Sequence, residues 1–77
     1  MNPTPLYVQL AAILRDMITT GELAPRGPLP SESYLQQDQG VSRGTVRMAV
    51  GILREEGLVV TIGGRGTFVR PRDTQDS

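Results

Sequence analysis

The sequence contains no cysteine and no histidine, and these two absences exclude several kinds of protein. Without cysteine the chain has no disulfide frame, and without either residue it lacks the usual ligands of a zinc site. The Ser-His and Cys-His nucleophile systems are excluded as well, and the carboxylates form no evident acid–base pair. We therefore expect no metal, no cofactor and no catalytic residue, and an enzyme is the least favoured class of function.

Long apolar segments are also missing. No apolar run approaches the roughly 20 residues that a membrane-spanning helix needs. The N-terminal residues MNPTPLY lack the basic and apolar regions of a signal peptide. A chain of 77 residues has room for one domain with a modest core. These features predict a single-domain cytoplasmic protein that does not bind a membrane.

Lysine is absent as well, so all eight positive charges are arginines, whose planar guanidinium groups suit phosphates and guanine edges. Eight acidic residues bring the formal net charge to zero. The distribution is uneven, because residues 41–72 hold six arginines against two glutamates, whereas residues 1–40 hold two arginines against four acidic residues. The second half is therefore basic, as expected of a nucleic-acid-binding surface.

Apolar residues at three- and four-residue spacing predict a first helix from about Thr4 to Thr20, with Pro5 in its first turn. The segment 21–30 holds three prolines and two glycines. It cannot continue a helix, and we expect an ordered connection there with at most a short strand around Leu29.

Two serines are well placed to begin the next helices. Ser31 is a suitable N-cap for a short second helix over residues 32–39, which ends at Gly40 in the tight turn of a helix-turn-helix. Ser42 caps a third helix, expected over Ser42–Glu56. Its apolar stripe faces the core, so the residues near its N-terminus on the other side face solvent, where a helix-turn-helix enters the major groove. These solvent-facing residues are Arg43, Gly44, Thr45 and Arg47.

A glycine-rich hairpin follows the third helix. Two short β-branched or apolar runs, 58–62 and 67–69, are joined by Gly63–Gly66. The glycines let the backbone approach a ligand closely, and Arg65 at the tip suits a narrow minor groove with its concentrated negative potential. This hairpin is the expected wing.

The chain resembles the N-terminal DNA-binding domain of the GntR family of bacterial transcriptional regulators. The resemblance rests on PLYVQLAAILRDMITTGEL at 5–23, LPSES at 29–33, GVSRGTVRMAV at 40–50, LREEGLV at 53–59 and GGRGTFV at 63–69. It implies a mainly α fold with a small β hairpin: a winged helix-turn-helix of three helices and a two- or three-stranded antiparallel wing over residues 1–70. The polar tail 71–77 is expected to be disordered.

The resemblance also implies a function. The chain is expected to bind a double-stranded operator, palindromic or nearly so, as a homodimer, and to act as a repressor. The third helix would lie in the major groove and Gly63–Gly66 in the minor groove. DNA contacts are predicted at Ser31, Ser42, Arg43, Gly44, Thr45, Arg47, Gly64, Arg65 and Gly66.

Two departures from the family pattern limit this transfer. Family members often carry arginine where Ser33 stands, so one phosphate or base contact is missing. Gly44 replaces the first threonine of the usual SRTT run. This change removes a side-chain contact and loosens the start of the helix by up to about 1 kcal/mol relative to alanine. An unusual operator preference follows.

Two alternatives stay open from the sequence. The family normally carries a C-terminal domain for effector binding and dimerisation, and this chain holds no effector site. Either the 77 residues are a whole protein that dimerises weakly or only on DNA, or they are a domain whose sensor has been cut away. A protein-interaction winged-helix module is the alternative function, because the zero net charge is compatible with it.

Overall fold

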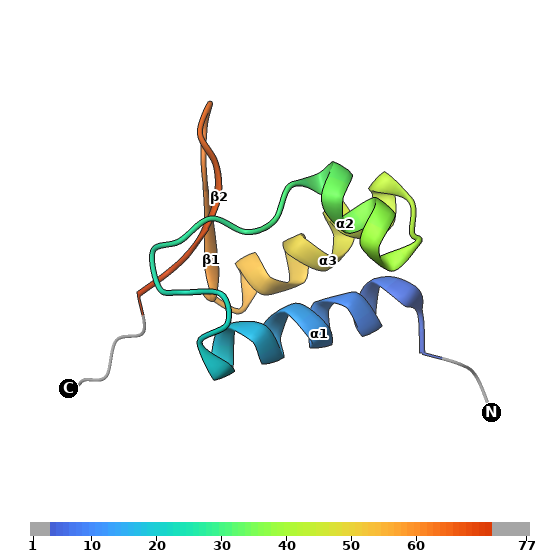
Figure 1. Ribbon diagram of the computed structural model, residues 1–77, viewed down its shortest axis with the longest axis horizontal. Helices are drawn as coiled ribbons and strands as arrows, with labels where there is room; N and C mark the ends of the chain where they lie inside the picture. Colours follow the sequence, from blue (N-terminus) through green and yellow to red (C-terminus); the bar gives the residue numbers. More distant parts are fainter. Residues whose placement is uncertain (1–3, 72–77) are drawn as a thin grey trace.

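The computed structural model describes residues 4–71 and contains three helices followed by a hairpin (Figure 1). The elements are α1 (Leu6–Thr20), α2 (Glu32–Gln39), α3 (Arg43–Glu55), β1 (Val59–Ile62) and β2 (Gly66–Val69). In Figure 1, α1 and α3 lie side by side, α2 lies near the start of α3, and the hairpin stands at the other end. This arrangement is the winged helix-turn-helix that the sequence predicts.

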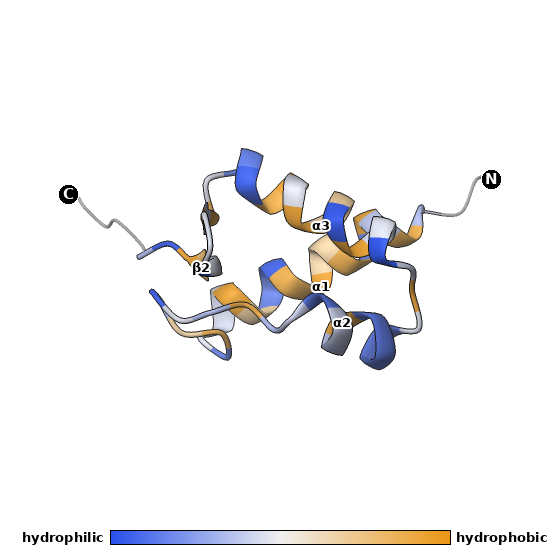
Figure 2. Ribbon diagram, turned by 90° about the horizontal axis from the view of Figure 1, so that it is seen from above, coloured by the Kyte–Doolittle hydropathy of each residue, from blue (hydrophilic) through white to orange (hydrophobic). Residues whose placement is uncertain are grey.

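The core forms mainly where α1 packs on α3. Leu14, Val46 and Leu53 are at most 1% exposed, and the burial of each such side chain contributes roughly 1.5–3 kcal/mol. Figure 2 shows α2 as largely hydrophilic, and Leu35 is its one buried residue. The buried residues are Leu10, Ala11, Leu14, Leu29, Leu35, Val46, Ala49, Leu53, Val59 and Val69. The core thus joins all three helices to the base of the hairpin.

The first helix begins slightly later than expected. Pro5 is the N-cap of α1 and not a residue of its first turn, because its ψ of 148° is extended. Its carbonyl oxygen accepts hydrogen bonds from the N–H groups of Val8 and Gln9, both at 3.1 Å. The predicted start near Thr4 was therefore early by about two residues, whereas the predicted end at Thr20 is confirmed.

The two serine caps are present as predicted. The Ser31 hydroxyl accepts from the N–H of Tyr34, and the Ser42 hydroxyl accepts from the N–H of Thr45, each at 3.1 Å. Gly40 ends α2 with a φ of +64°, a conformation that glycine adopts at no steric cost. The turn from α2 to α3 is therefore short, which sets the start of α3 beside α2.

The connection between α1 and α2 pairs with the wing. The N–H of Arg26 donates to the Val69 carbonyl at 2.8 Å, and the N–H of Leu29 donates to the Thr67 carbonyl at 2.9 Å. A single β-bridge joins Pro28 to Phe68, at the place where a short strand was expected. The two-stranded sheet therefore gains a third line of backbone pairing, and Figure 1 shows this segment crossing the hairpin on its way to α2.

One turn in this connection is conformationally unusual. The N–H of Gly27 donates to the carbonyl of Ala24 at 3.0 Å, with Pro25 and Arg26 between them. Arg26 is the non-glycine residue with a positive φ, +69°, in the described part of the chain. A type II turn has this conformation at its third position and favours glycine there. The turn therefore carries backbone strain at Arg26.

The predicted tail at 71–77 lies outside the described residues except for Pro71. Among residues 4–71, no helix has the length and apolar character needed to cross a bilayer.

Candidate nucleic-acid interface

The N-terminus of α3 presents a hydroxyl pair to solvent. Besides capping the helix, the Ser42 hydroxyl donates to Thr45 Oγ1 at 3.0 Å. The hydrogen of Ser42 is therefore used within the helix, and the hydroxyl hydrogen of Thr45 is available to an outside acceptor. A phosphate at this end would meet that hydroxyl together with the free N–H groups of the first turn, where the helix dipole favours an anion.

Arg43 and Arg47 are held by one carboxylate. The Nε atoms of Arg43 and Arg47 donate to Oε1 and Oε2 of Glu32, each at 3.1 Å. The two arginines are one helical turn apart on α3, and Glu32 lies in the first turn of α2, so the carboxylate bridges the two helices of the motif. The side chains of the arginines remain 62% and 59% exposed, and their Nη groups lie outside these bonds. Glu32 thus positions both guanidinium groups and leaves their Nη atoms free of these bonds.

This arrangement sets the charge state of Glu32. The hydrogen bond from Arg47 is the largest influence and lowers the pKa of the carboxyl, desolvation opposes it, and Arg43 adds a further lowering. Glu32 is therefore ionised throughout the neutral range, and the bridge carries a net charge of plus one.

Sequence reasoning missed Glu32. A second ion pair joins α1 to the end of α3, where the Glu56 carboxylate accepts two hydrogen bonds from Arg15, at 2.9 and 2.7 Å. Both pairings join residues that are far apart in the chain. The sequence shows only that Glu32 is an acidic residue in the first turn of the second helix. This position does not indicate which arginines it binds.

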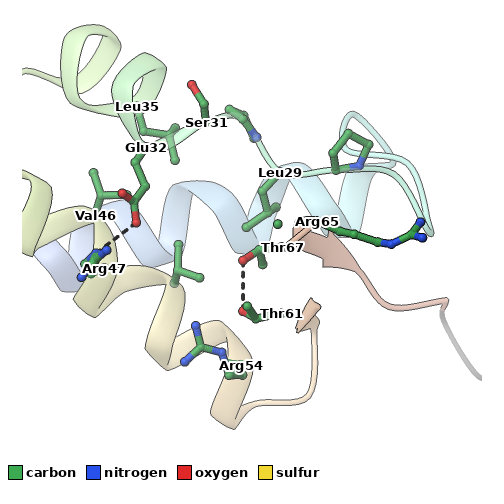
Figure 3. A pocket seen from close by; sticks show the side chains of 14 residues that line it. Leu29, Ser31, Glu32, Leu35, Val46, Arg47, Arg54, Thr61, Arg65 and Thr67 are labelled. Carbon is green, nitrogen blue, oxygen red and sulfur yellow. Dashed lines mark hydrogen bonds and ion pairs between the residues drawn. The ribbon is translucent and has the colours of Figure 1, made fainter. Parts of the chain in front are cut away.

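A groove separates α3 from the wing. Its volume is about 700 Å³, and Ser31 and Glu32 lie at its α2 end. Figure 3 shows Arg47 and Arg54 on the α3 side and the Thr61–Thr67 pair on the wing side. Three arginines and one carboxylate line this groove, so its lining is basic.

The wing tip is a tight turn closed by a hydrogen bond of 3.0 Å from the N–H of Arg65 to the Ile62 carbonyl. Gly64 has a φ of +76°, which this turn requires at its third position. Arg65 is exposed, and the residues of the tip are exposed with it. The tip therefore presents backbone and one guanidinium group without bulky side chains.

The structure distributes the predicted contact residues over three places. The N-terminus of α3 carries Ser42, Arg43, Gly44 and Thr45. The groove brings together Ser31, Arg47, Arg65 and Gly66, which come from α2, α3 and the wing. Gly64 lies at the wing tip. Glu32 connects the first two places, because it lines the groove and also binds Arg43.

Packing does not require a glycine at position 44. A Cβ at this position would meet only the Ser42 hydroxyl, at 3.9 Å, and the φ of Gly44 is not positive. The space beside it is open, so packing leaves room for a side chain at this position. Farther along the same helix, Ile52 is half-buried against the core.

The described residues include no group of three or more metal-ligating side chains that could hold an ion. The candidate contact surface consists of guanidinium groups, hydroxyls and helix N-termini. These are the groups that position proteins on DNA phosphates and read base edges.

Comparison with known proteins identifies the family of this chain. The model of the gntR family of bacterial regulatory proteins matches residues 6–69. The chain belongs to the GntR family. Family membership confirms the expected regulatory, non-enzymatic class.

Relatives and solved structures extend the match over most of the chain. The HTH-type transcriptional repressor NagR of Bacillus subtilis is 47% identical over 88% of this chain and 28% of its own length. The repressor MngR of Escherichia coli K12 is 47% identical over 91% of this chain and 29% of its own. The AraR DNA-binding domain in complex with operator ORE1 is 39% identical, covers 87% of this chain and 82% of that chain, and has a TM-score of 0.83. The GntR chain described here thus spans less than a third of these two repressors.

Proposed function

We propose that this GntR chain binds operator DNA as the DNA-binding domain of a transcriptional repressor. In this proposal, the N-terminus of α3 enters the major groove and Gly63–Gly66 enters the adjacent minor groove. The observation that carries it is the pair Arg43 and Arg47, held side by side on α3 with their Nη groups exposed. The repressor names of two relatives and the operator complex of a structural neighbour support it.

The arginines supply sequence preference. A guanidinium fork that pairs with O6 and N7 of guanine gives roughly 1–3 kcal/mol of discrimination per contact. The bond to Glu32 already restricts the rotamers of both side chains, so less conformational entropy is lost on binding. Thr45 and the helix N-termini at Ser31 and Ser42 would hold phosphates and fix the register. Gly64, Arg65 and Gly66 would contact the minor groove, and Gly44 would let the backbone approach the duplex.

The proposed assembly is a homodimer on a palindromic site. Two copies of α3 in successive major grooves would lie about 34 Å apart, one turn of duplex. We place this assembly in the bacterial cytoplasm, where chromosomal operators are found. The proposal assigns only DNA contacts to this chain and gives no residue of it a role in binding an effector.

A titration of the protein against DNA from upstream of its own gene tests the proposal. The competitor is a scrambled duplex of equal length, and both are measured by fluorescence anisotropy at about 50 and about 200 mM salt. We expect at least roughly tenfold preference for the native duplex and a steep loss of affinity as salt rises.

An arginine outside the interface provides the matched control. Arg26→Gly removes one positive charge from a residue whose N–H bonds to Val69, at the end of β2 that lies away from the wing tip, and should leave the preference intact. Weak, salt-insensitive binding to both duplexes, unchanged by loss of Arg43 or Arg47, would contradict the proposal and favour a protein-interaction surface.

A further inference from the structure

The groove between α3 and the wing has two facing walls of different chemistry. The α3 wall carries Arg47 and Arg54, which are seven residues apart and therefore share one face of the helix, about 10 Å apart along its axis. The wing wall carries Thr61 and Thr67. Arg47 is tied to Glu32, but Arg54 joins none of the ion pairs found within residues 4–71. Arg54 is therefore an uncompensated cation facing the groove (Figure 3).

The two threonines present a hydrogen-bond donor opposite Arg54. They are register partners in the hairpin, and their hydroxyl oxygens lie 3.0 Å apart. One hydroxyl donates to the other, so the hydrogen of the second remains available to an acceptor in the groove. Glu32 is the single carboxylate of the lining, and both of its oxygens are already bonded to arginines. The groove thus offers a guanidinium and a hydroxyl donor to an anion, with no free carboxylate to repel it.

The docking geometry determines which anion would fill this groove. A protein that inserts one element into the major groove and another into the adjacent minor groove must straddle the sugar–phosphate strand that separates them. Here the two elements are α3 and the wing, and the space between them is the groove that Arg54 faces. The strand that divides the two DNA grooves would therefore run through it.

We propose that Arg54, together with the Thr61–Thr67 hydroxyl pair, binds a backbone phosphate of the DNA strand that passes between α3 and the wing. The inference rests on the proposed function and adds a site to it. Arg54 positions the strand and carries no sequence information, in contrast to Arg43 and Arg47. The anion is a phosphodiester held within a duplex, and free phosphate is the competing source that the experiment separates.

The test compares Arg54→Gln with the wild-type chain on the native and the scrambled duplex over a series of salt concentrations. We expect affinity for both duplexes to fall by about three- to tenfold, with an unchanged preference ratio and a salt slope reduced by about 1. Thr67→Val should lower the affinity for both duplexes by a smaller factor. Because Arg54 and Thr67 share one phosphate, the double variant should lose less than the product of the two single effects.

Two controls make the result specific. Arg26→Gly removes the same charge outside the groove and should change the salt slope less than Arg54→Gln. A neutral methylphosphonate in place of the phosphate proposed to contact Arg54 should lower the DNA affinity of the wild-type chain. It should leave the affinity of the Arg54→Gln variant unchanged. Arg54 is exposed, so the variant should fold, and its melting temperature checks this.

Three outcomes would overturn the site alone. Unchanged affinity and salt slope in Arg54→Gln, with the wild-type preference intact, would remove this phosphate contact and leave the proposed function standing. A changed preference ratio would make Arg54 a base-reading residue. Binding of inorganic phosphate that is lost in Arg54→Gln while duplex binding is unaffected would assign the groove to a small anion. Failure of the wild-type chain to prefer its native duplex would instead overturn the proposed function, and this site with it.

Discussion

The helix-turn-helix and the wing hold the groups that we propose to contact DNA in different ways. At the helix-turn-helix, Arg43 and Arg47 are positioned by side-chain ion pairs to Glu32. At the wing, the hairpin is positioned by backbone hydrogen bonds between residues 26–29 and β2, and Arg65 extends from an exposed turn. Ion pairs between exposed groups respond to salt and pH, whereas backbone pairing responds little. Salt and pH should therefore change how Arg43 and Arg47 are positioned, whereas the fold itself fixes the position of the wing.

The largest expected effect comes from removing a positioned arginine. Arg47→Met keeps much of the apolar side-chain length and deletes the guanidinium group. We expect a loss of about 10- to 100-fold in affinity for the operator and a much smaller loss for scrambled DNA. Anisotropy titrations on both duplexes measure the ratio. An equal loss of affinity for both duplexes would show that Arg47 contacts a phosphate, as we propose for Arg54, and does not read a base.

A change in the wing's backbone support should affect stability and not binding. Arg26→Gly relieves the positive φ of +69° and should raise the free energy of unfolding by about 1 kcal/mol. For a domain of this size, the melting temperature would rise by about 4–8 °C. Arg26→Ala is the control, because it removes the same charge and keeps the strain. Equal melting temperatures for the two variants would show that the turn carries no strain.

Two glycines in α3 separate helix stability from DNA approach. Added Cβ atoms at Gly44 and Gly51 would meet open space, apart from the Ser42 hydroxyl at 3.9 Å, so Gly44→Ala and Gly51→Ala should each stabilise the fold by up to about 1 kcal/mol. Only Gly44→Ala should weaken operator binding, because Gly44 is in the first turn of α3. Thermal melts and titrations on the same samples measure both effects. Equal operator affinities would place the duplex away from Gly44.

Removing the shared carboxylate tests whether positioning matters. Glu32→Gln keeps the size of the side chain and removes its charge, so both arginines lose their ionic partner. We expect affinity for scrambled DNA to rise and the preference for the operator to fall by a few-fold. Glu22→Gln removes the same charge from an exposed residue of the segment after α1 and is the control. An unchanged preference in Glu32→Gln would mean that the arginines need no prior positioning.

The smallest expected effect is the dependence of stability on pH. Hydrogen bonds from Arg47 to Glu32 and from Arg15 to Glu56 lower the pKa of each carboxyl below its ordinary value of 4.5. A lowered folded-state pKa stabilises the fold fully above the unfolded value, and this contribution is lost as pH falls through the folded value. Chemical denaturation should therefore give constant stability from neutral pH to about pH 5 and a decline below it. A double variant Glu32→Gln and Glu56→Gln should show a shallower decline.

Local chemistry made much of the fold predictable. Ser31, Ser42 and Gly40 begin or end helices through bonds to residues a few positions away, so their roles follow from the sequence. The start of α1 was placed early, because proline is favoured at the first helical position, whereas Pro5 is the N-cap here. The third line of sheet pairing was only partly anticipated, since it depends on the distant β2.

The electrostatic organisation of the site could not be read from the sequence. Glu32 is 11 and 15 residues from its two arginines, and Arg15 is 41 residues from Glu56. Such pairs depend on how two helices are rotated against each other, which apolar spacing does not determine for exposed residues. The sequence predicts which arginines face solvent, and the structure adds what holds them.

The Pro28–Phe68 bridge links the wing to the start of α2. Leu29 is bonded to the wing through Thr67, and two residues later Ser31 opens α2, so the wing and the helix-turn-helix are joined by a very short piece of chain. The opening between the wing and the helix-turn-helix should therefore keep a fixed width. We expect duplexes whose major and adjacent minor grooves are separated by a matching distance to bind, and duplexes with another separation to bind more weakly, so that the shape of the DNA is selected even at base pairs that no side chain contacts.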